Sequence, residues 1–279
     1  MTVHAAPSCP SIALVGFGEA GSVFASAGDW AGKARGWDIL AERRTLMEDC
    51  GVEAASDAAA ALADADLVLS LVTADAAPRA ASEYAGLLRD GAIWCDMNSV
   101  APQTKQQAAR AVESHGGRYV DVAVMAPVDP AALAVPLLVS GAATSEAEAL
   151  LRAAGFINIR VAGSEVGRAS AIKMIRSVMV KGLEALTDEC AAAARAAGVY
   201  DEVMASLDAS KRDWNWTETT EYNLERMETH GLRRAAEMEE VAATLQALGV
   251  EPLMTEAAVV RQRSAARNAT RDTNRKSAA

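Results

Sequence analysis

The sequence predicts an α/β domain with a mostly parallel sheet, followed by an all-α domain. Through residues 1–163, short apolar runs alternate with helix-length segments, and several runs are apolar at consecutive positions, as in strands buried on both faces. From residue 164 onward, long helical stretches follow one another without a convincing strand. We therefore expect a first domain of residues 1–163, with residues 1–10 disordered, and a second of residues 164–279, frayed from about residue 265.

The individual elements follow from these patterns. Strands are expected at Ser11–Val15, Trp37–Ala41, Leu67–Val72, Ala92–Asp96, Tyr119–Val124, Pro136–Ser140 and Phe156–Arg160. Helices of the first domain are expected at Ala20–Ala27, Arg44–Cys50, Ser56–Ala63, Pro78–Arg89 and Pro102–His115. In the second domain we expect a first helix over Glu165–Ala197 and breaks at Gly198, around Asp213–Thr217 and near Gly249–Pro252.

Charge and composition exclude several classes of function. The net charge of −10 leaves no basic surface for nucleic acid. No apolar run is long enough to span a membrane, and the first residues lack the pattern of a secretory signal, so a cytoplasmic protein is expected. The four cysteines and three histidines show no metal-ligand spacing, and we expect no metal site.

A glycine-rich motif connects the first strand to the first helix. It reads Gly16-Phe17-Gly18-Glu19-Ala20-Gly21. In a GxGxxG motif the first glycine permits a tight turn, the second lets the backbone approach a pyrophosphate, and the third allows close helix packing. Free N–H groups at the helix N-terminus favour phosphate. The motif predicts a Rossmann domain that binds NAD or NADP; the alternative is a tight turn without a ligand.

The end of the second predicted strand contains conflicting signals for the cofactor. Glu42 occupies the acidic position that would accept the ribose hydroxyls of NAD, whereas Arg43 and Arg44 could hold the 2′-phosphate of NADP. Two guanidinium groups against one carboxylate favour NADP slightly. A solvated helix start is the alternative explanation for all three.

Two further loops are expected beside the cofactor. Val72 and Thr73 follow the third strand, where they should line the site. Asn98 and Ser99 follow the fourth, near the point where ligands collect in such sheets, and are candidates for contacting the nicotinamide end or the substrate. Capping of the helix that begins at Pro102 is an alternative, compatible role.

A polar stripe runs along the otherwise apolar first helix of the second domain. It contains Lys173, Ser177, Lys181 and Glu184. Beside an oxidised nicotinamide, desolvation and like charge disfavour the ammonium form of a lysine, which could then accept a hydroxyl proton as hydride leaves. We expect Lys173 to be the general acid/base; a purely structural ion pair is the alternative. Because this helix is apolar nearly all round, a homodimer through the helical domain is expected.

Four segments together resemble the β-hydroxyacid dehydrogenase superfamily, which includes 3-hydroxyisobutyrate and 6-phosphogluconate dehydrogenases. They read GFGEAG, DMNSVAPQTK, VDVAVMAPV and GRASAIKMIRSVMVKGLEAL. The chain looks closest to a branch with a phosphogluconate-dehydrogenase-like C-terminal domain. The resemblance implies that Lys173 is the acid/base and that the protein is a dimer or larger.

Two departures from this pattern concern the substrate. Ser177 stands where the family commonly has a substrate-binding Asn, and Met125-Ala126-Pro127 stands where it has roughly Ser-Gly-Gly to bind a carboxylate. Because Pro127 has no N–H to donate, we expect a bulkier or less anionic substrate than a small hydroxy acid. Lys181 is then a candidate extra cation for substrate.

The last candidate residues lie in the helical domain. His230 and Arg233 could close the substrate pocket, from the same or the partner subunit, although solvated helix charge is the alternative. The sequence thus predicts an NAD(P)-dependent oxidoreductase acting on a hydroxy acid or related secondary alcohol. An imine reductase and an inactive NADPH-binding regulator are the competing hypotheses.

Overall fold

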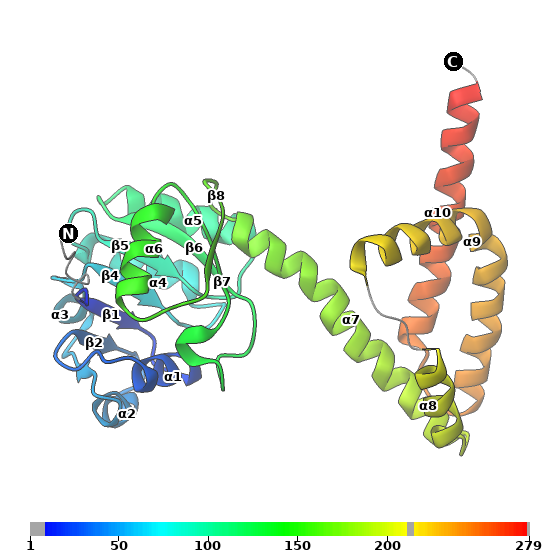
Figure 1. The fold of residues 1–279 in the computed structure, drawn as a ribbon, viewed down its shortest axis with the longest axis horizontal. Coiled ribbons are helices and arrows are strands. Elements are labelled where there is room, and N and C mark those ends of the chain that lie inside the picture. Colours follow the sequence, from blue (N-terminus) through cyan, green and yellow to red (C-terminus); the bar gives the residue numbers. More distant parts are fainter. Residues whose placement is uncertain (1–8, 211–214, 278–279) are drawn as a thin grey trace, which may run out of the picture. The chain divides into compact units, whose positions relative to one another are not determined.

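The structure, a computed structural model, describes residues 9–210 and 215–277 (Figure 1). It divides into two compact units, Met1–Arg176 and Ser177–Ala279. The first is α/β and the second is helical, which confirms the predicted fold class. The disorder expected for residues 1–10 concerns mainly residues outside the described ones.

An eight-stranded sheet forms the centre of the first unit, in the order β3-β2-β1-β4-β5-β6-β7-β8. Strands β1 to β6 pair in parallel, β7 is antiparallel to β6, and β8 is parallel to β7. The strands are β1 (Ile12–Val15), β2 (Ala34–Trp37), β3 (Glu53–Ala54), β4 (Leu67–Ser70), β5 (Ile93–Asp96), β6 (Arg118–Val124), β7 (Leu137–Ser140) and β8 (Ile159–Gly163).

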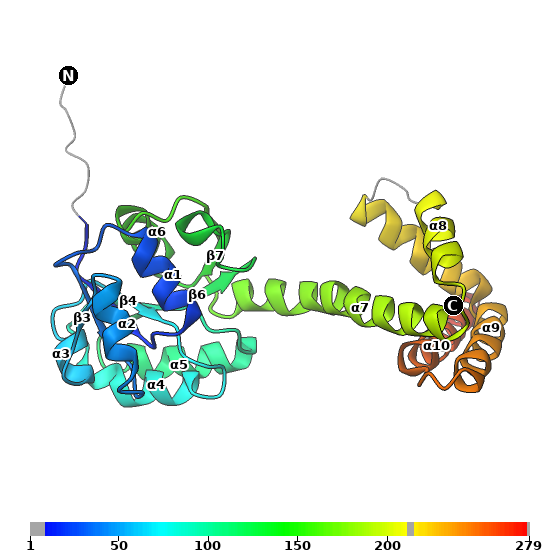
Figure 2. The same ribbon diagram turned by 90° about the horizontal axis from the view of Figure 1, so that it is seen from below.

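Helices cover both faces of this sheet (Figure 2). One face packs on α1 (Glu19–Ala27), α2 (Arg43–Asp49) and α6 (Thr144–Ala153). The other packs on α3 (Ala58–Leu62), α4 (Ala77–Tyr84) and α5 (Pro102–Glu113). Successive residues of β1 alternate between the two cores, with Leu14 in one and Val15 in the other. Short 3₁₀ turns occupy η1 (Ala85–Leu87) and η2 (Ala132–Ala134).

Two strands differ from the prediction by three or more residues. The strand expected at Trp37–Ala41 is wrong: β2 ends at Trp37, and Ile39 and Leu40 after it are 67% and 44% exposed. Their apolar character does not reflect a buried strand. The strand expected at Phe156–Arg160 begins later, at Ile159, because Phe156 is a core residue in the preceding turn. The two-residue strand β3 is too short for a periodicity to reveal.

The helical region consists of α7 (Arg168–Ala196), α8 (Tyr200–Ala209), α9 (Trp216–Ala247) and α10 (Leu253–Ser277). The breaks at Gly198 and near Gly249–Pro252 fall where the sequence predicts them. The break expected around Asp213–Thr217 lies partly outside the described residues, and α9 begins at Trp216. The first turns of α7 belong to the first unit, and its residues from Ser177 onward to the second. In the second unit α9 packs along α10, which continues to Ser277, beyond the start of the expected fraying. None of the helices, over the residues described, has the length and apolarity to cross a membrane.

Candidate functional site

A pocket opens at the carboxyl ends of the first strands. The chain builds β1, β2 and β3 outward on one side and then crosses to β4 on the other side of β1. Such a reversal leaves a crevice at the carboxyl edge, where ligands bind in doubly wound sheets. Five of the cofactor-binding residues predicted from the sequence line this pocket: Gly16, Gly18, Arg43, Val72 and Thr73.

The glycine-rich turn shapes one wall of this pocket. Gly16 has a φ of +88°, and a Cβ there would lie 2.7 Å from the backbone oxygen of Leu71. Gly18 caps α1, and a Cβ there would meet no described atom within 4 Å. Gly21 is buried against the backbone of Gly16 and the ring of Phe17. The turn therefore brings the N-terminus of α1 to an open backbone surface, which suits a phosphate.

The other residues of the motif have different surroundings. The side chain of Phe17 is fully buried in the core, so only its backbone can face a ligand. Glu19 is exposed in the first turn of α1, followed by the half-buried Ala20.

The carboxylate at the end of β2 is that of Asp38, twenty residues after Gly18, and it lines the pocket. Its Oδ2 accepts the backbone N–H of Phe17 at 2.7 Å, and its Oδ1 accepts that of Leu40 at 2.8 Å. Sequence reasoning missed Asp38 because the predicted strand was placed four residues too late. An acidic residue at this spacing after the glycine motif was the available signal.

Glu42, Arg43 and Arg44, the three candidates for selecting the cofactor, have different surroundings in the structure. Arg43 lines the pocket. Glu42 is an exposed residue at the start of α2 and is not among the lining residues. The guanidinium of Arg44 donates to the backbone oxygens of Ala55 and Ser56. Arg44 therefore supports the loop after β3.

Asn98 lies beyond the end of β5, 5% exposed. Its Nδ2 donates to Asp96 Oδ1 at 2.7 Å and to Ser70 Oγ at 3.0 Å. Because a carboxylate oxygen accepts and does not donate, this contact fixes which way the amide faces. Asn98 Oδ1 is then buried without a hydrogen-bond partner among the described residues. A buried acceptor without a partner is uncommon in folded proteins, which makes Asn98 a candidate for a contact with a ligand.

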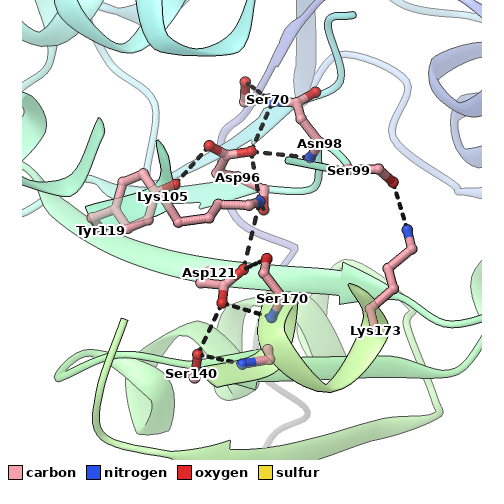
Figure 3. A network of polar contacts seen from close by, with 11 residues as sticks. Ser70, Asp96, Asn98, Ser99, Lys105, Tyr119, Asp121, Ser140, Ser170 and Lys173 are labelled. Atoms are coloured by element: carbon pink, nitrogen blue, oxygen red, sulfur yellow. Dashed lines mark hydrogen bonds and ion pairs between the residues drawn. The ribbon is translucent and has the colours of Figure 1, made fainter. Parts of the chain in front are cut away.

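Lys173 and Ser99 are brought together from α7 and the loop after β5 (Figure 3). Lys173 Nζ donates to Ser99 Oγ at 2.6 Å. Ser99 is exposed, whereas Asn98 beside it is buried. The amine therefore lies at an accessible position next to the buried amide.

A buried polar network lies beneath this pair (Figure 3). Lys105, 0% exposed, donates to Asp96 Oδ1 at 2.8 Å and forms an ion pair with Asp121 Oδ1 at 3.5 Å. Tyr119 donates its hydroxyl to Asp96 Oδ2 at 2.6 Å. Burial, together with the charge of Asp96 and this hydrogen bond, raises the pKa of Tyr119 well above its usual value. Tyr119 therefore remains a donor at neutral pH.

The same network reaches the start of α7. Asp121 Oδ2 accepts the backbone N–H of Ser170 at 3.0 Å, and its Oδ1 accepts the Ser170 hydroxyl at 2.6 Å. Ser140 Oγ accepts the N–H of Ala169 at 3.0 Å and donates to Asp121 Oδ2. These bonds satisfy N–H groups that a helix start leaves without intrahelical partners.

A close approach precedes this helix start. Gly167 has a φ of +97°, and a Cβ there would lie 3.0 Å from Cβ of Pro102. Only glycine fits this turn comfortably, so α7 begins against the start of α5.

Met125 follows β6, and its surroundings bear on the substrate. Its backbone N–H donates to the oxygen of Pro136 at 2.9 Å. Its side chain packs with Ala123, Leu138 and Ala169. In the segment Met125-Ala126-Pro127, the N–H of Met125 is therefore engaged within the protein, and Pro127 has no N–H to offer an anion.

The remaining predicted residues belong to the second unit, and their roles stay predictions. Ser177 is half-buried on α7, while His230 and Arg233 are exposed on α9. The side chain of Lys181 lies outside the described residues.

Sequence reasoning missed the buried charges of the network. Asp96 ends the otherwise apolar strand β5, and Asp121 lies between two valines in β6, which was a usable signal of buried carboxylates. Lys105 gave no such signal, because it lies in the polar sequence PQTKQQ.

Comparison with known proteins agrees with this geometry. Residues 11–163 match the family described as the NAD binding domain of 6-phosphogluconate dehydrogenase, and residues 194–265 match a domain of unknown function (DUF1932). A conserved hypothetical protein from Sinorhizobium meliloti 1021 is 37% identical, with a TM-score of 0.62 over 94% of this chain and 90% of that one.

Two other solved structures are also similar. A conserved protein of unknown function, described as structurally similar to 3-hydroxyacid dehydrogenases, is 28% identical, with a TM-score of 0.61 over 92% of this chain and 98% of that one. A variant imine reductase from Myxococcus stipitatus in complex with NAD⁺ is 19% identical, with a TM-score of 0.74 over 93% and 94% of the two chains, and shares the fold.

The fold is therefore that of NAD(P)-dependent dehydrogenases and reductases. By the match over residues 11–163, the chain belongs to the family of the NAD binding domain of 6-phosphogluconate dehydrogenase.

Proposed function

We propose that this protein is an NAD(P)-dependent oxidoreductase that interconverts a secondary alcohol and a carbonyl compound, with Lys173 as general acid/base. The observation that supports this most directly is the 2.6 Å hydrogen bond from Lys173 Nζ to Ser99 Oγ. It holds an accessible amine beside the loop that follows β5, at the edge of the sheet where a dinucleotide would end.

Two features of the described residues fit a dinucleotide. Gly18 leaves open space at the N-terminus of α1, where a pyrophosphate would receive backbone N–H groups. Asn98 Oδ1 is a buried acceptor without a partner among the described residues, suited to an amide or hydroxyl of the nicotinamide end. When bound, the nicotinamide supplies or accepts the hydride.

Asp38 favours NAD as the cofactor. Its carboxylate lines the pocket at the end of β2, where it could accept ribose hydroxyls and would repel a 2′-phosphate. The slight preference for NADP inferred from the sequence depended on Arg43 and Arg44, and Arg44 is engaged with the loop after β3. Arg43 alone remains to oppose Asp38.

In this mechanism the protein moves the proton. In the oxidative direction, Nζ of Lys173 in its neutral form takes the proton of the substrate hydroxyl. In the reductive direction, its ammonium form polarises the carbonyl and then protonates the oxygen. Ser99 holds Nζ in place through their hydrogen bond.

The loop after β6 favours a substrate without a small carboxylate at that position. The N–H of Met125 is donated to Pro136, and Pro127 has none, so little backbone remains there to bind an anion. This observation also supports a second candidate, reduction of a C=N bond, the activity named for the imine reductases that share the fold.

We also propose that the protein is a homodimer through its helical region. Apolar side chains on α7 are exposed in the single chain, among them Val178 at 71%, Met179 at 48% and Leu186 at 45%. A second copy would remove this surface from water.

A substrate panel tests the proposed reaction. Hydroxy acids and larger secondary alcohols are supplied with NAD⁺ or NADP⁺, and cyclic imines with NADH or NADPH. The absorbance of the reduced cofactor is followed in each case. Alcohol oxidation dependent on Lys173 supports the dehydrogenase. Imine reduction without any alcohol turnover would contradict the dehydrogenase and support the second candidate, reduction of a C=N bond. Tight cofactor binding without any turnover would indicate a regulator and contradict both.

A further inference from the structure

We infer that Asp121 is a positioning residue that holds Lys173 in register with Ser99, acting through the buried network beneath them. The inference deepens the proposed function, since it takes Lys173 as the group to be positioned. Asp121 itself is fully buried in β6 and touches neither Lys173 nor Ser99 in the hydrogen bonds of the structure.

Asp121 is linked to Lys173 through Ser170. Asp121 accepts both the backbone N–H and the hydroxyl of Ser170. Ser170 precedes Lys173 by three residues in α7, less than one helical turn, so the two Cα atoms move as one rigid piece. A shift of Ser170 on the sheet is therefore passed directly to Lys173.

Asp121 is also linked to Ser99, through Lys105 and Asp96. Lys105 donates to Asp96 and forms an ion pair with Asp121, so one ammonium joins the carboxylates of β5 and β6. Asp96 Oδ1 in turn accepts the backbone N–H of Asn98 at 3.0 Å, which fixes the residue just before Ser99. Both partners of the Lys173–Ser99 hydrogen bond are thus anchored to the same buried charges.

Net stability is a poor explanation for such a cluster. Removing an ammonium and two carboxylates from water costs much of what their attraction returns, and apolar side chains of similar volume often stabilise a core as well. Charged groups and hydrogen bonds, however, have directions, and they define a single relative position for the segments that they join. That property is what a general acid/base requires when a hydrogen bond of 2.6 Å to Ser99 holds it in place.

The test compares three single substitutions in the full-length protein. Ser170→Ala removes the hydroxyl that Asp121 accepts, and Asp121→Asn removes the charge while keeping an oxygen that can cap α7. Tyr119→Phe is the matched control, because it deletes one buried hydrogen bond of Asp96 that lies off the path between Ser99 and Lys173. Circular dichroism establishes that each variant is folded.

The readout is the rate of acetylation of Lys173 relative to that of the exposed Lys33, measured by mass spectrometry on the folded protein. It requires no substrate. We expect Ser170→Ala and Asp121→Asn to raise this ratio about tenfold, the effect of losing one hydrogen bond to a charged group. Tyr119→Phe should leave it at the wild-type value. If Asp121→Asn does not fold, Ser170→Ala alone decides.

Equal ratios in Ser170→Ala, any folded Asp121→Asn, Tyr119→Phe and the wild type would overturn the inference, whatever the effect on thermal stability. A raised ratio together with a Lys173 that proves dispensable for turnover would instead leave the positioning intact and contradict the proposed function. Where a substrate is turned over, Ser170→Ala should lower kcat while the KM for the cofactor stays unchanged.

Discussion

The amine of Lys173 donates a hydrogen bond of 2.6 Å to the hydroxyl of Ser99, although the two residues are 74 positions apart in the sequence. One residue comes from a loop at the carboxyl edge of the sheet and the other from the start of a long helix. Their contact places a titratable amine at the carboxyl edge of the sheet, where Rossmann domains bind dinucleotides.

Lys173→Met should abolish turnover and spare cofactor binding. Loss of a positioned acid/base lowers kcat by roughly 10²- to 10⁴-fold. The dissociation constant of NADH, from fluorescence titration, should not change. Lys33→Met, at an exposed lysine of the same unit, is the control. Equal turnover of Lys173→Met and wild type would refute the assignment of Lys173.

Gly16→Ala and Gly18→Ala should differ in their effect on stability. A Cβ on Gly16 would collide with Leu71 at a φ of +88°, so we expect a loss of stability of about 1–3 kcal/mol. A Cβ on Gly18 would collide with nothing described, and thermal unfolding should be nearly unchanged. Both variants should weaken cofactor binding. Intact binding in Gly18→Ala would contradict a pyrophosphate at that turn.

Asp38→Asn should shift cofactor preference toward NADPH. Without its charge the side chain no longer repels a 2′-phosphate. The ratio of the NADPH to NADH dissociation constants should fall by about tenfold or more, because two like charges about 4 Å apart cost on the order of 1–4 kcal/mol. Glu42→Gln, which removes a charge outside the pocket, is the control. An unchanged ratio in Asp38→Asn would exclude Asp38 from cofactor selection.

Glu189 should make the stability of the helical unit depend on pH. Burial raises the pKa of Glu189, but hydrogen bonds from Thr255 and from the backbone of Met254 outweigh it, and the pKa is lowered overall. A carboxyl group with a lower pKa in the folded state stabilises it above its unfolded pKa, and this contribution is lost as pH falls through the folded pKa. The thermal unfolding temperature should therefore decrease when the pH is lowered below the usual pKa range of glutamate.

Glu189→Gln is the control for this pH dependence. The variant should be less stable than wild type at neutral pH, with a smaller loss on acidification. Parallel pH profiles for the two proteins would show that another group is responsible.

Val178→Glu should disrupt the proposed homodimer. Val178 is 71% exposed in the single chain, so the substitution leaves the fold intact but places a charge in an apolar interface. Light scattering should change from twice the 29.1 kDa chain mass to that mass. Ser206→Glu, on an exposed position of α8, should remain a dimer. A wild-type protein that is already monomeric would contradict the proposal.

The sequence by itself determined most of the order of strands and helices, although not the strand β3. It also determined the helix breaks at Gly198 and near Gly249–Pro252 and the glycine turn. These features depend on local patterns: buried parallel strands are continuously apolar, and Gly16 permits the positive φ of the turn after β1. Lys173 also emerged from the sequence, because a lysine in an apolar helix is conspicuous.

Only the tertiary structure decided which acidic residue ends β2 and what holds Lys173. The apolar run after Trp37 resembles a strand, but its side chains are exposed. Pairing with β1 ends at Trp37, so that Asp38 is the acidic residue that follows the strand. Lys105 lies in a polar sequence and is fully buried, because Asp96 and Asp121 supply its counter-charges from two neighbouring strands. Partners of a buried charge are contacts between distant segments, and no local pattern encodes them.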